Sequence, residues 1–315
     1  MKKIFTLITA ALFAVNVNAQ DIPSGLVYLL DFEGATSVSD FGGVQHGSGV
    51  LVKSDDPNFG TYYQNWPDAS GDPTLITNYL EVVPETNPWQ KLIDNGLTEF
   101  TVSFWVNATV ANTNSIGNYW GSLFTVYSNA GVAETREWYY PVGPDLRYQG
   151  QFHYNNWGYC DNNHDDYMPT VGAWSADNNW HHFAWVFSEI GETTSFKLTL
   201  YVDGTQIFSI TEAVNGDDCV GSNMLNDMDR FVIGGASPIW ADPDNAYGYD
   251  DIAIYSSALT QSQVEYIITQ KKTSTGISSV KTTSNTTVRY SLAGRKIDAA
   301  YKGVVIENGK KFVVK

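Results

Sequence analysis

The sequence has 315 residues and a formal net charge of −16, from 34 acidic and 18 basic residues. Ten of the basic and two of the acidic residues lie in 271–315, a net of +8, whereas 20–270 holds 6 basic and 32 acidic residues, a net of −26. So acidic a body repels phosphates and anionic lipid, which excludes nucleic acid as a partner and favours neutral ligands or bound cations.

Residues 1–19 have the layout of a secretory signal peptide. Lys2 and Lys3 precede an apolar run, and the small residues Val17 and Ala19 precede an expected cut before Gln20. No later stretch approaches the ~20 apolar residues that a membrane helix needs. We therefore expect a secreted or cell-surface protein without a transmembrane segment.

The body, residues 20–270, has short segments in which apolar and polar side chains alternate, separated by Gly- and Asn-rich loops. Period-two alternation of this kind predicts β-strands, here in the segments 27–32, 101–106, 181–187, 198–203 and 252–255. Asp203-Gly204 predicts a tight hairpin turn. The sequence thus predicts an all-β sandwich or barrel.

One short helix is expected near the end of the body. Thr260 and Gln263 have the spacing of a capping box. Val264, Ile267 and Ile268 then form an apolar stripe at helical spacing, which predicts that the helix seals one face of a sheet.

The segment 271–287 is rich in Thr, Ser and other small residues and is interpreted as a linker. A short β-rich tail, 288–315, follows. Its Asn308-Gly309 pair predicts a two-residue hairpin.

The chain has two cysteines, Cys160 and Cys219. An exported protein passes through an oxidising space, so they form either a disulfide or two free thiols. The two positions lack the spacing of a zinc site.

Four segments in order resemble the laminin-G-like, concanavalin A-like lectin/glucanase superfamily. They are LVYLLDFEG at 26–34, LTEFTVSFWVNA at 97–108, WHHFAWVF with LTLYVDGTQIF at 180–208, and FVIGG with YGYDDIAIYSSALTQSQVEYI at 231–267. The resemblance implies a two-sheet antiparallel jelly-roll sandwich over 20–270. Beside that pattern, residues 119–179 are interpreted as an insertion.

The tail is similar to the C-terminal tails of exported Bacteroidetes proteins, some of which are sorting signals for type IX secretion. This resemblance implies that secretion machinery is a partner of residues 288–315, and that the tail is separate from the binding unit.

The resemblance also implies a structural calcium where the first strand meets the last. The matching positions are Glu33 and Asp250, with Asp251 adjacent. Oxygen ligands of this kind suit calcium. The alternative is that Asp250 accepts backbone hydrogen bonds at a turn.

Catalysis is disfavoured without being excluded. Related family 16 glycoside hydrolases carry a Glu-x-Asp-x-x-Glu strand, and this spacing is absent here. His181 and His182 match positions that are structural in the family, and no Ser or Cys nucleophile accompanies them.

Aromatic rings and planar amides complement the faces and hydroxyls of sugars. Candidate ligand-binding aromatics lie in predicted loops: Trp120, Trp138, Tyr140, Trp157 and Trp240. The alternative is that these rings fill a minor core beneath the loops.

We therefore predict a secreted, non-catalytic carbohydrate-binding protein that recognises a polysaccharide or surface glycan. The alternatives are a cell-surface adhesion domain that binds protein, or a divergent glycoside hydrolase or lyase.

Overall fold

The computed structural model describes most of the body and the strands of the tail. The described ranges are 22–65, 78–108, 122–128, 142–147, 152–155, 159–161, 177–191, 195–213, 225–234, 247–273, 289–291, 296–297, 303–307 and 310–314. The signal peptide prediction lies outside them. The chain forms two compact units, Met1–Ser274 and Thr275–Lys315.

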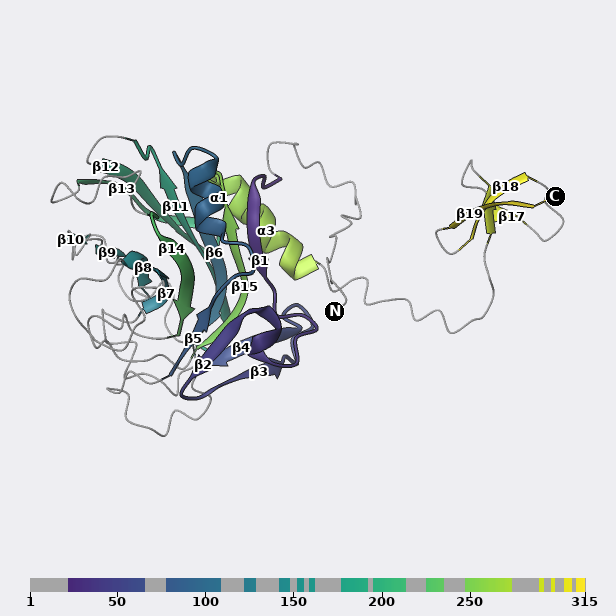
Figure 1. Ribbon diagram of the computed structural model, residues 1–315, viewed down its shortest axis with the longest axis horizontal. Coiled ribbons are helices and arrows are strands. Elements are labelled where there is room, and N and C mark those ends of the chain that lie inside the picture. The colour runs from purple at the N-terminus through teal and green to yellow at the C-terminus, as the bar shows by residue number, and fades with distance from the viewer. Residues whose placement is uncertain are drawn as a thin grey trace. The chain divides into compact units, whose positions relative to one another are not determined.

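The first unit contains two antiparallel sheets (Figure 1). The first sheet has eight strands, and β1 (Leu26–Leu30) pairs with β15 beside the main path. The order along that path is β13 (Thr205–Ala213), β12 (Ser195–Val202), β11 (Trp180–Ser188), β6 (Phe100–Asn107), β15 (Gly248–Tyr255), β4 (Thr61–Asn65) and β3 (Gly49–Lys53).

The second sheet has seven strands. Their order is β10 (Tyr159–Asp161), β9 (Phe152–Asn155), β8 (Val142–Arg147), β7 (Ser122–Ser128), β14 (Met228–Ile233), β5 (Tyr79–Val82) and β2 (Gly43–His46). The region 119–179, interpreted from the sequence as an insertion, thus supplies four strands of this sheet. Its short strands are interrupted by polar segments, which hid the alternation that marks a strand.

The core lies between the two sheets. Alternate side chains of each strand point inward, so Phe104 and Phe183 of the first sheet pack with Phe124 and Phe231 of the second. The rings of Phe104 and Phe124 stack across the interface with centroids 5.9 Å apart, and Phe124 stacks on Phe231 within the second sheet with centroids 4.9 Å apart. The predicted all-β sandwich is confirmed.

Two α-helices and a 3-10 turn accompany the described parts of the sheets: η1 (Val38–Phe41), α1 (Pro88–Asp94) and α3 (Gln261–Thr273). None of these helices has the length and apolar character that a membrane crossing requires.

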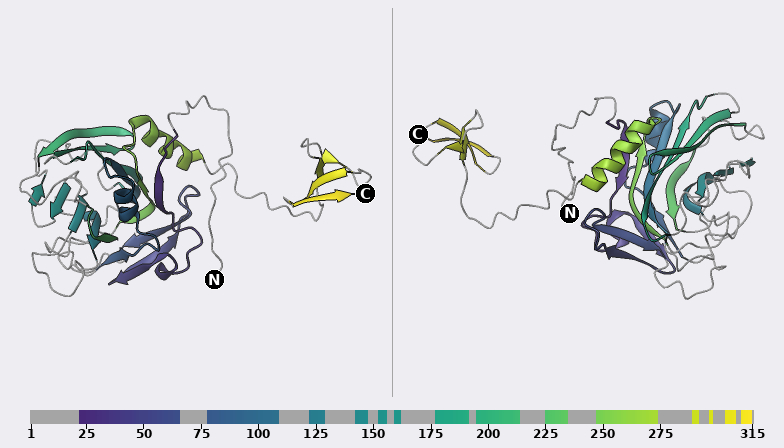
Figure 2. Two further views of the ribbon diagram at one scale, coloured as in Figure 1. Left: turned by 45° about the horizontal axis from the view of Figure 1, so that its top comes forward. Right: turned by 180° about the vertical axis from the view of Figure 1, so that it is seen from behind.

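Helix α3 covers part of the outer face of the first sheet, as the views of Figure 2 show. Val264 and Ile268 of the helix are buried in a cluster with Trp105, Ala184 and other outward-facing residues of that sheet. The predicted seal is confirmed.

The start of α3 is also as predicted. The Gln263 Oε1 atom accepts a hydrogen bond from the Thr260 backbone N–H at 2.9 Å, and Thr260 Oγ1 accepts one from the Gln263 N–H at 3.4 Å. The helix continues to Thr273, so the first three residues of the predicted linker are helical.

Both predicted hairpins are present. Asp203 and Gly204 join β12 to β13 with φ values of 51° and 79°, the left-handed conformation that a tight hairpin turn needs. In the second unit, β18 (Gly303–Glu307) pairs with β19 (Lys310–Val314), and Glu307 lies opposite Lys310. That sheet is completed by β16 (Arg289–Ser291) and β17 (Lys296–Ile297).

The seal between α3 and the first sheet predicts the effect of Val264→Ala. Val264 is 0% exposed, so its truncation leaves a cavity and lowers the free energy of unfolding by about 2 kcal/mol. Val50→Ala is the matched control, because Val50 is 44% exposed and its truncation changes stability by less than ~0.5 kcal/mol. Urea denaturation measures both, and equal losses would contradict a seal by α3.

Candidate functional site

The five aromatic residues predicted to bind a ligand, Trp120, Trp138, Tyr140, Trp157 and Trp240, lie outside the described residues. Cys219 does so too, whereas Cys160 belongs to β10 with only its backbone described. The disulfide therefore stays a prediction, as do the roles of the five rings. The described strands, however, show where the segments that carry these rings are attached.

Strand ends from both sheets meet at one end of the sandwich, which we call the Asn65 end. Asn65, the last residue of β4, donates its backbone N–H to the Tyr247 carbonyl just before β15. The next residue, Gly248, lies opposite Asn107 at the end of β6, and Asn107 lies opposite Trp180 at the start of β11. These contacts gather four strand ends of the first sheet.

The Asn65 side chain extends this contact to the second sheet. Its Nδ2 atom donates to the carbonyl of Asn78, before β5, at 2.9 Å and to that of Gly234, after β14, at 2.6 Å. Its Oδ1 atom accepts from the Tyr63 hydroxyl at 2.9 Å. Asn65 is 0% exposed, so its amide forms these hydrogen bonds with protein atoms in place of water. The same bonds join the two sheets.

Gly234 fits this arrangement because it lacks a side chain. Its φ is 77°, and a Cβ atom there would lie 2.5 Å from Cγ of Asn65. Both the left-handed backbone and the close approach thus require glycine. The asparagine and the glycine form one unit that fixes the Asn65 end.

Five segments outside the described residues begin or end at the Asn65 end: 66–77, 109–121, 148–151, 162–176 and 235–246. Two of these segments carry Trp120 and Trp240. The register of the strands thus attaches the two segments that carry these residues to one end of the sandwich.

Trp138, Tyr140 and Trp157 belong to segments attached at the opposite end. Ser128, at the end of β7, lies opposite Met228 at the start of β14, and Val142 lies opposite Asn155. The segments 129–141 and 156–158 leave from these positions. The sequence alone did not separate the five rings into two groups.

Described aromatic and amide side chains also gather at the Asn65 end, on the outer face of the first sheet. We call Tyr62, Gln64, Asn107 and Trp180 the Trp180 patch. All four side chains are half-buried. The Trp180 ring stacks on the Phe59 ring with centroids 4.3 Å apart, and meets the Tyr62 ring edge-on at 5.1 Å.

Gly248 lies between the two main rings of the Trp180 patch. A Cβ atom at this position would lie 3.1 Å from carbon atoms of both Trp180 and Tyr62. The absence of a side chain therefore lets the two rings close over β15. Trp180 occurs in a motif noted in the sequence, whereas Tyr62 was missed, although alternation within TYYQN could have placed it on the outer face.

A histidine clamp holds the chain on either side of Trp180. His181 Nδ1 lies 2.7 Å from Asp203 Oδ2, and His181 Nε2 lies 3.2 Å from Asp177 Oδ1. Asp203 Oδ1 also accepts the backbone N–H of His182 at 2.9 Å. The hydrogen bond to Asp203 and the charges of both carboxylates raise the pKa of His181, although burial opposes the shift.

His182 has a structural role, as the sequence indicated. Its ring is buried and packs edge-on against Trp105 with centroids 5.1 Å apart. Burial lowers the pKa of His182 to about 4, so the ring is neutral at physiological pH.

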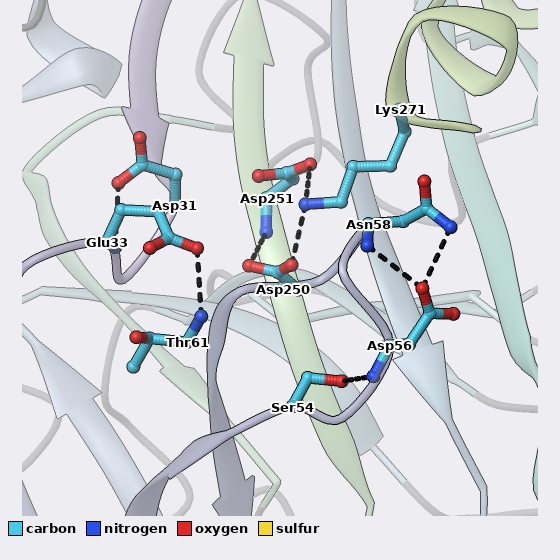
Figure 3. Close-up of polar contacts among 9 residues, drawn as sticks. All are labelled: Asp31, Glu33, Ser54, Asp56, Asn58, Thr61, Asp250, Asp251 and Lys271. Atoms are coloured by element: carbon cyan, nitrogen blue, oxygen red, sulfur yellow. Dashed lines mark hydrogen bonds and ion pairs between the residues drawn. The ribbon is translucent and has the colours of Figure 1, made fainter. Parts of the chain in front are cut away.

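The two predicted calcium ligands, Glu33 and Asp250, lie in an acidic region beside α3 (Figure 3). Glu33 Oε1 accepts the Thr61 backbone N–H at 2.8 Å. Asp250 Oδ1 accepts the Asp251 N–H at 2.9 Å, and its Oδ2 atom lies 2.7 Å from Lys271 Nζ. Burial, with the neighbouring Asp251 carboxylate, raises the pKa of Asp250 to about 8.

The arrangement of these side chains does not fit a calcium ion as it stands. An ammonium lies between Asp250 and Asp251, and Glu33 is engaged by the backbone of β4. Among the described residues, no three His, Cys, Asp or Glu side chains converge as a metal site requires. The calcium itself stays a prediction.

The second sheet carries another charged cluster on its outer face. Glu81 is buried, pairs with Arg230 and lies 3.1 Å from His46 Nε2. The hydrogen bond from His46 and the pairing with Arg230 lower the pKa of Glu81, although burial opposes the shift. Glu81 and Asp250, the buried acids of the described ranges, lie on opposite outer faces of the sandwich, so they cannot flank one glycosidic bond.

Comparison with known families finds one match. The model described as "Concanavalin A-like lectin/glucanases superfamily" matches residues 77–265, more than half of the chain. A comparison with curated proteins finds no match.

Several solved structures have a similar fold. The binding domain of botulinum neurotoxin DC in complex with rat synaptotagmin II is 15% identical, with a TM-score of 0.49, over 91% of this chain and 62% of that one. Domain 4 of an extracellular arabinanase from Geobacillus stearothermophilus, in complex with arabinotriose, is 15% identical, with a TM-score of 0.44, over 77% and 98%.

The binding domain of Paraclostridial Mosquitocidal Protein 1 is 14% identical, with a TM-score of 0.42, over 77% of this chain. The chain spans about half the length of that domain, 51%. At such identities and TM-scores, these likenesses carry no conclusion about a ligand.

Replacing Asn65 tests the contact between the sheets. Asn65→Ala leaves the Asn78 and Gly234 carbonyls without this partner, and we expect a loss of about 3 kcal/mol in the free energy of unfolding. The control is Asn95→Ala, at an exposed helix end, with a loss below ~0.5 kcal/mol. Chemical denaturation that gave similar values for both variants would contradict the proposed contact.

The histidine clamp predicts a pH dependence of stability. Because folding raises the pKa of His181, its stabilisation is fully present below the unfolded value of 6.5 and is lost as pH rises through the folded pKa. His181→Gln therefore flattens the decline of Tm on the alkaline side of pH 6.5. An NMR titration of the His181 ring gives the pKa directly, and a value at or below 6.5 would rule out the clamp.

Proposed function

Because the chain belongs to the concanavalin A-like lectin/glucanases superfamily, we propose that it is a secreted, non-catalytic protein that binds a polysaccharide or surface glycan at the Asn65 end. The observation that carries this proposal is the Trp180 patch. There, half-buried Trp180 and Tyr62 rings lie beside the amides of Gln64 and Asn107.

The chemistry of the patch suits a neutral sugar. Aromatic faces pack against the C–H surface of a sugar ring, and planar amides exchange hydrogen bonds with its hydroxyls. The strongly acidic body disfavours a polyanionic glycan, because like charges repel. We therefore place a neutral glycan in this site.

The patch is also placed where further aromatic residues are attached. Trp120 and Trp240 belong to segments that leave the Asn65 end, so they are the candidates to extend the binding surface. The segments that carry the other three rings, Trp138, Tyr140 and Trp157, are attached at the opposite end. These rings contribute to the proposed site only if their segments extend along the sandwich to the Asn65 end. The proposal therefore ranks Trp120 and Trp240 above the other three.

The basic tail is separate from this function in the proposal. The second compact unit begins at Thr275 and has its own four-stranded sheet. We infer that secretion machinery recognises this unit and that the first unit alone binds glycan.

The alternative is a domain that binds protein, and one observation favours it. β2 and β3 are edge strands of the two sheets, and they expose Val44 and Val50 by 49% and 44%. Exposed apolar side chains on edge strands are a common basis for protein association. A chain that binds no glycan but loses a surface partner on Val44→Ser or Val50→Ser would support this alternative.

Two tyrosine variants, one on each outer face of the sandwich, test the proposal through their affinity for glycan. Tyr62→Ala removes a ring of the Trp180 patch and is expected to raise Kd about 5- to 10-fold, from the loss of one aromatic contact. Tyr79→Ala removes a half-buried ring from the outer face of the second sheet and leaves Kd unchanged. Array screening followed by calorimetry measures both, and an effect confined to Tyr79→Ala would refute the placement of the site.

The same assay separates the two groups of loop aromatics. We expect Trp120→Ala and Trp240→Ala to weaken binding at least as much as Tyr62→Ala, and Trp138→Ala and Trp157→Ala to leave it within about twofold. Circular dichroism confirms that each variant folds. Loss of binding in Trp138→Ala or Trp157→Ala alone would move the site to the opposite end.

A further inference from the structure

The pair Asp250 and Asp251 lies on β15 beneath helix α3. Lys271, in the last turn of α3, places its Nζ atom 2.7 Å from Oδ2 of Asp250 and 2.7 Å from Oδ2 of Asp251 (Figure 3). Asp250 is 0% exposed, and the Lys271 side chain is 14% exposed. One ammonium thus links two acidic residues of the sheet to the helix.

The backbone is shaped to bring both carboxylates to this ammonium. Successive residues of a regular strand point to opposite faces of a sheet. Between Asp250 and Ala253, however, the register of β15 against β6 shifts, and Asp251 has a φ of 46°. This bulge turns the Asp251 carboxylate toward Lys271 and away from the position that regular pairing would give it.

Lys271 makes a further contact that fixes its place. Its Nζ atom lies 5.0 Å from the centroid of the Phe59 ring, as in a cation–π contact. Phe59 in turn stacks on Trp180. The ammonium is therefore held by two carboxylates and one aromatic face in a mostly buried position.

Glu33, the other predicted calcium ligand, accepts a hydrogen bond from the backbone. Glu33 Oε1 accepts the Thr61 N–H, and Gly60 leaves the space for it, because a Cβ atom at Gly60 would overlap this oxygen. Glu33 thus holds the turn between β3 and β4.

We propose that the Lys271 ammonium is the structural cation of this site, so that the folded chain needs no calcium where the resemblance implies one. A lysine of α3 neutralises buried Asp250 and half-buried Asp251 of β15 and at the same time fixes the helix on the first sheet. The position of Phe59, and through it that of Trp180, depends on this internal ion pair.

Thermal unfolding in EDTA and in millimolar calcium tests this proposal. The wild-type Tm is expected to be the same in both. Lys271→Met leaves buried Asp250 and half-buried Asp251 without their counter-ion and lowers Tm in EDTA by roughly 10 °C. Calcium then raises the Tm of Lys271→Met, because two adjacent carboxylates without an ammonium between them can bind calcium, which prefers oxygen ligands.

Two further variants keep the result interpretable. Lys272→Met removes the adjacent exposed lysine and changes Tm by less than ~2 °C. Lys271→Arg keeps the charge and retains most of the wild-type Tm. Equal losses in Lys271→Arg and Lys271→Met would overturn the role of charge.

A wild-type Tm that rises with calcium would overturn the proposal, as would a Lys271→Met variant that calcium does not stabilise. Should Lys271→Met fail to fold, the wild-type comparison decides alone: an unchanged Tm supports the internal cation, and a rise refutes it. Neither result depends on glycan binding, so the proposed function is tested separately.

Discussion

The buried amide of Asn65 hydrogen-bonds to carbonyls that flank two strands of the second sheet, while its own strand belongs to the first. A buried polar group without partners would cost about 1–3 kcal/mol, so the amide and its acceptors stabilise one relative position of the two sheets. Tyr63 and Gly234 complete the contact, one through its hydroxyl and the other through the space it leaves. The strand ends that carry the candidate site are positioned by this contact.

The outer face of the first sheet is divided between a covered and a partly open part. Helix α3 covers Trp105 and its neighbours, whereas Tyr62 and Trp180 stay half-buried at the edge of this cover. Phe59 belongs to both parts, because it packs under the Lys271 ammonium and stacks on Trp180. Stability of the helix contact and orientation of the patch are thus physically connected.

Much of the fold could be predicted because its determinants are local. Alternation predicted β6, β11, β12 and β15, the capping box predicted the start of α3, and Asp203-Gly204 predicted a hairpin. β7 to β10 were interpreted as an insertion, because their short segments show no sustained period and gain their pairing only from β14 and from one another.

The candidate site was less accessible from the sequence. Asn65 lies in a polar stretch, and no local sequence pattern indicates that its amide joins the two sheets. Its partner Gly234 lies 169 residues later in the chain. Composition predicts a linker that begins at Lys271, although this residue pairs with acids that lie 20 and 21 residues earlier. Such contacts depend on the packing of distant elements, which a linear pattern does not encode.

The central claim is that glycan binds at the Asn65 end, on the Trp180 patch. The most direct test of this placement is a crystal structure of the whole chain with an oligosaccharide that is known to bind it in solution. We expect a sugar ring in contact with Tyr62 and Trp180 and hydrogen-bonded to Gln64 or Asn107. A sugar bound on the outer face of the second sheet, beside His46 and Tyr79, would contradict it.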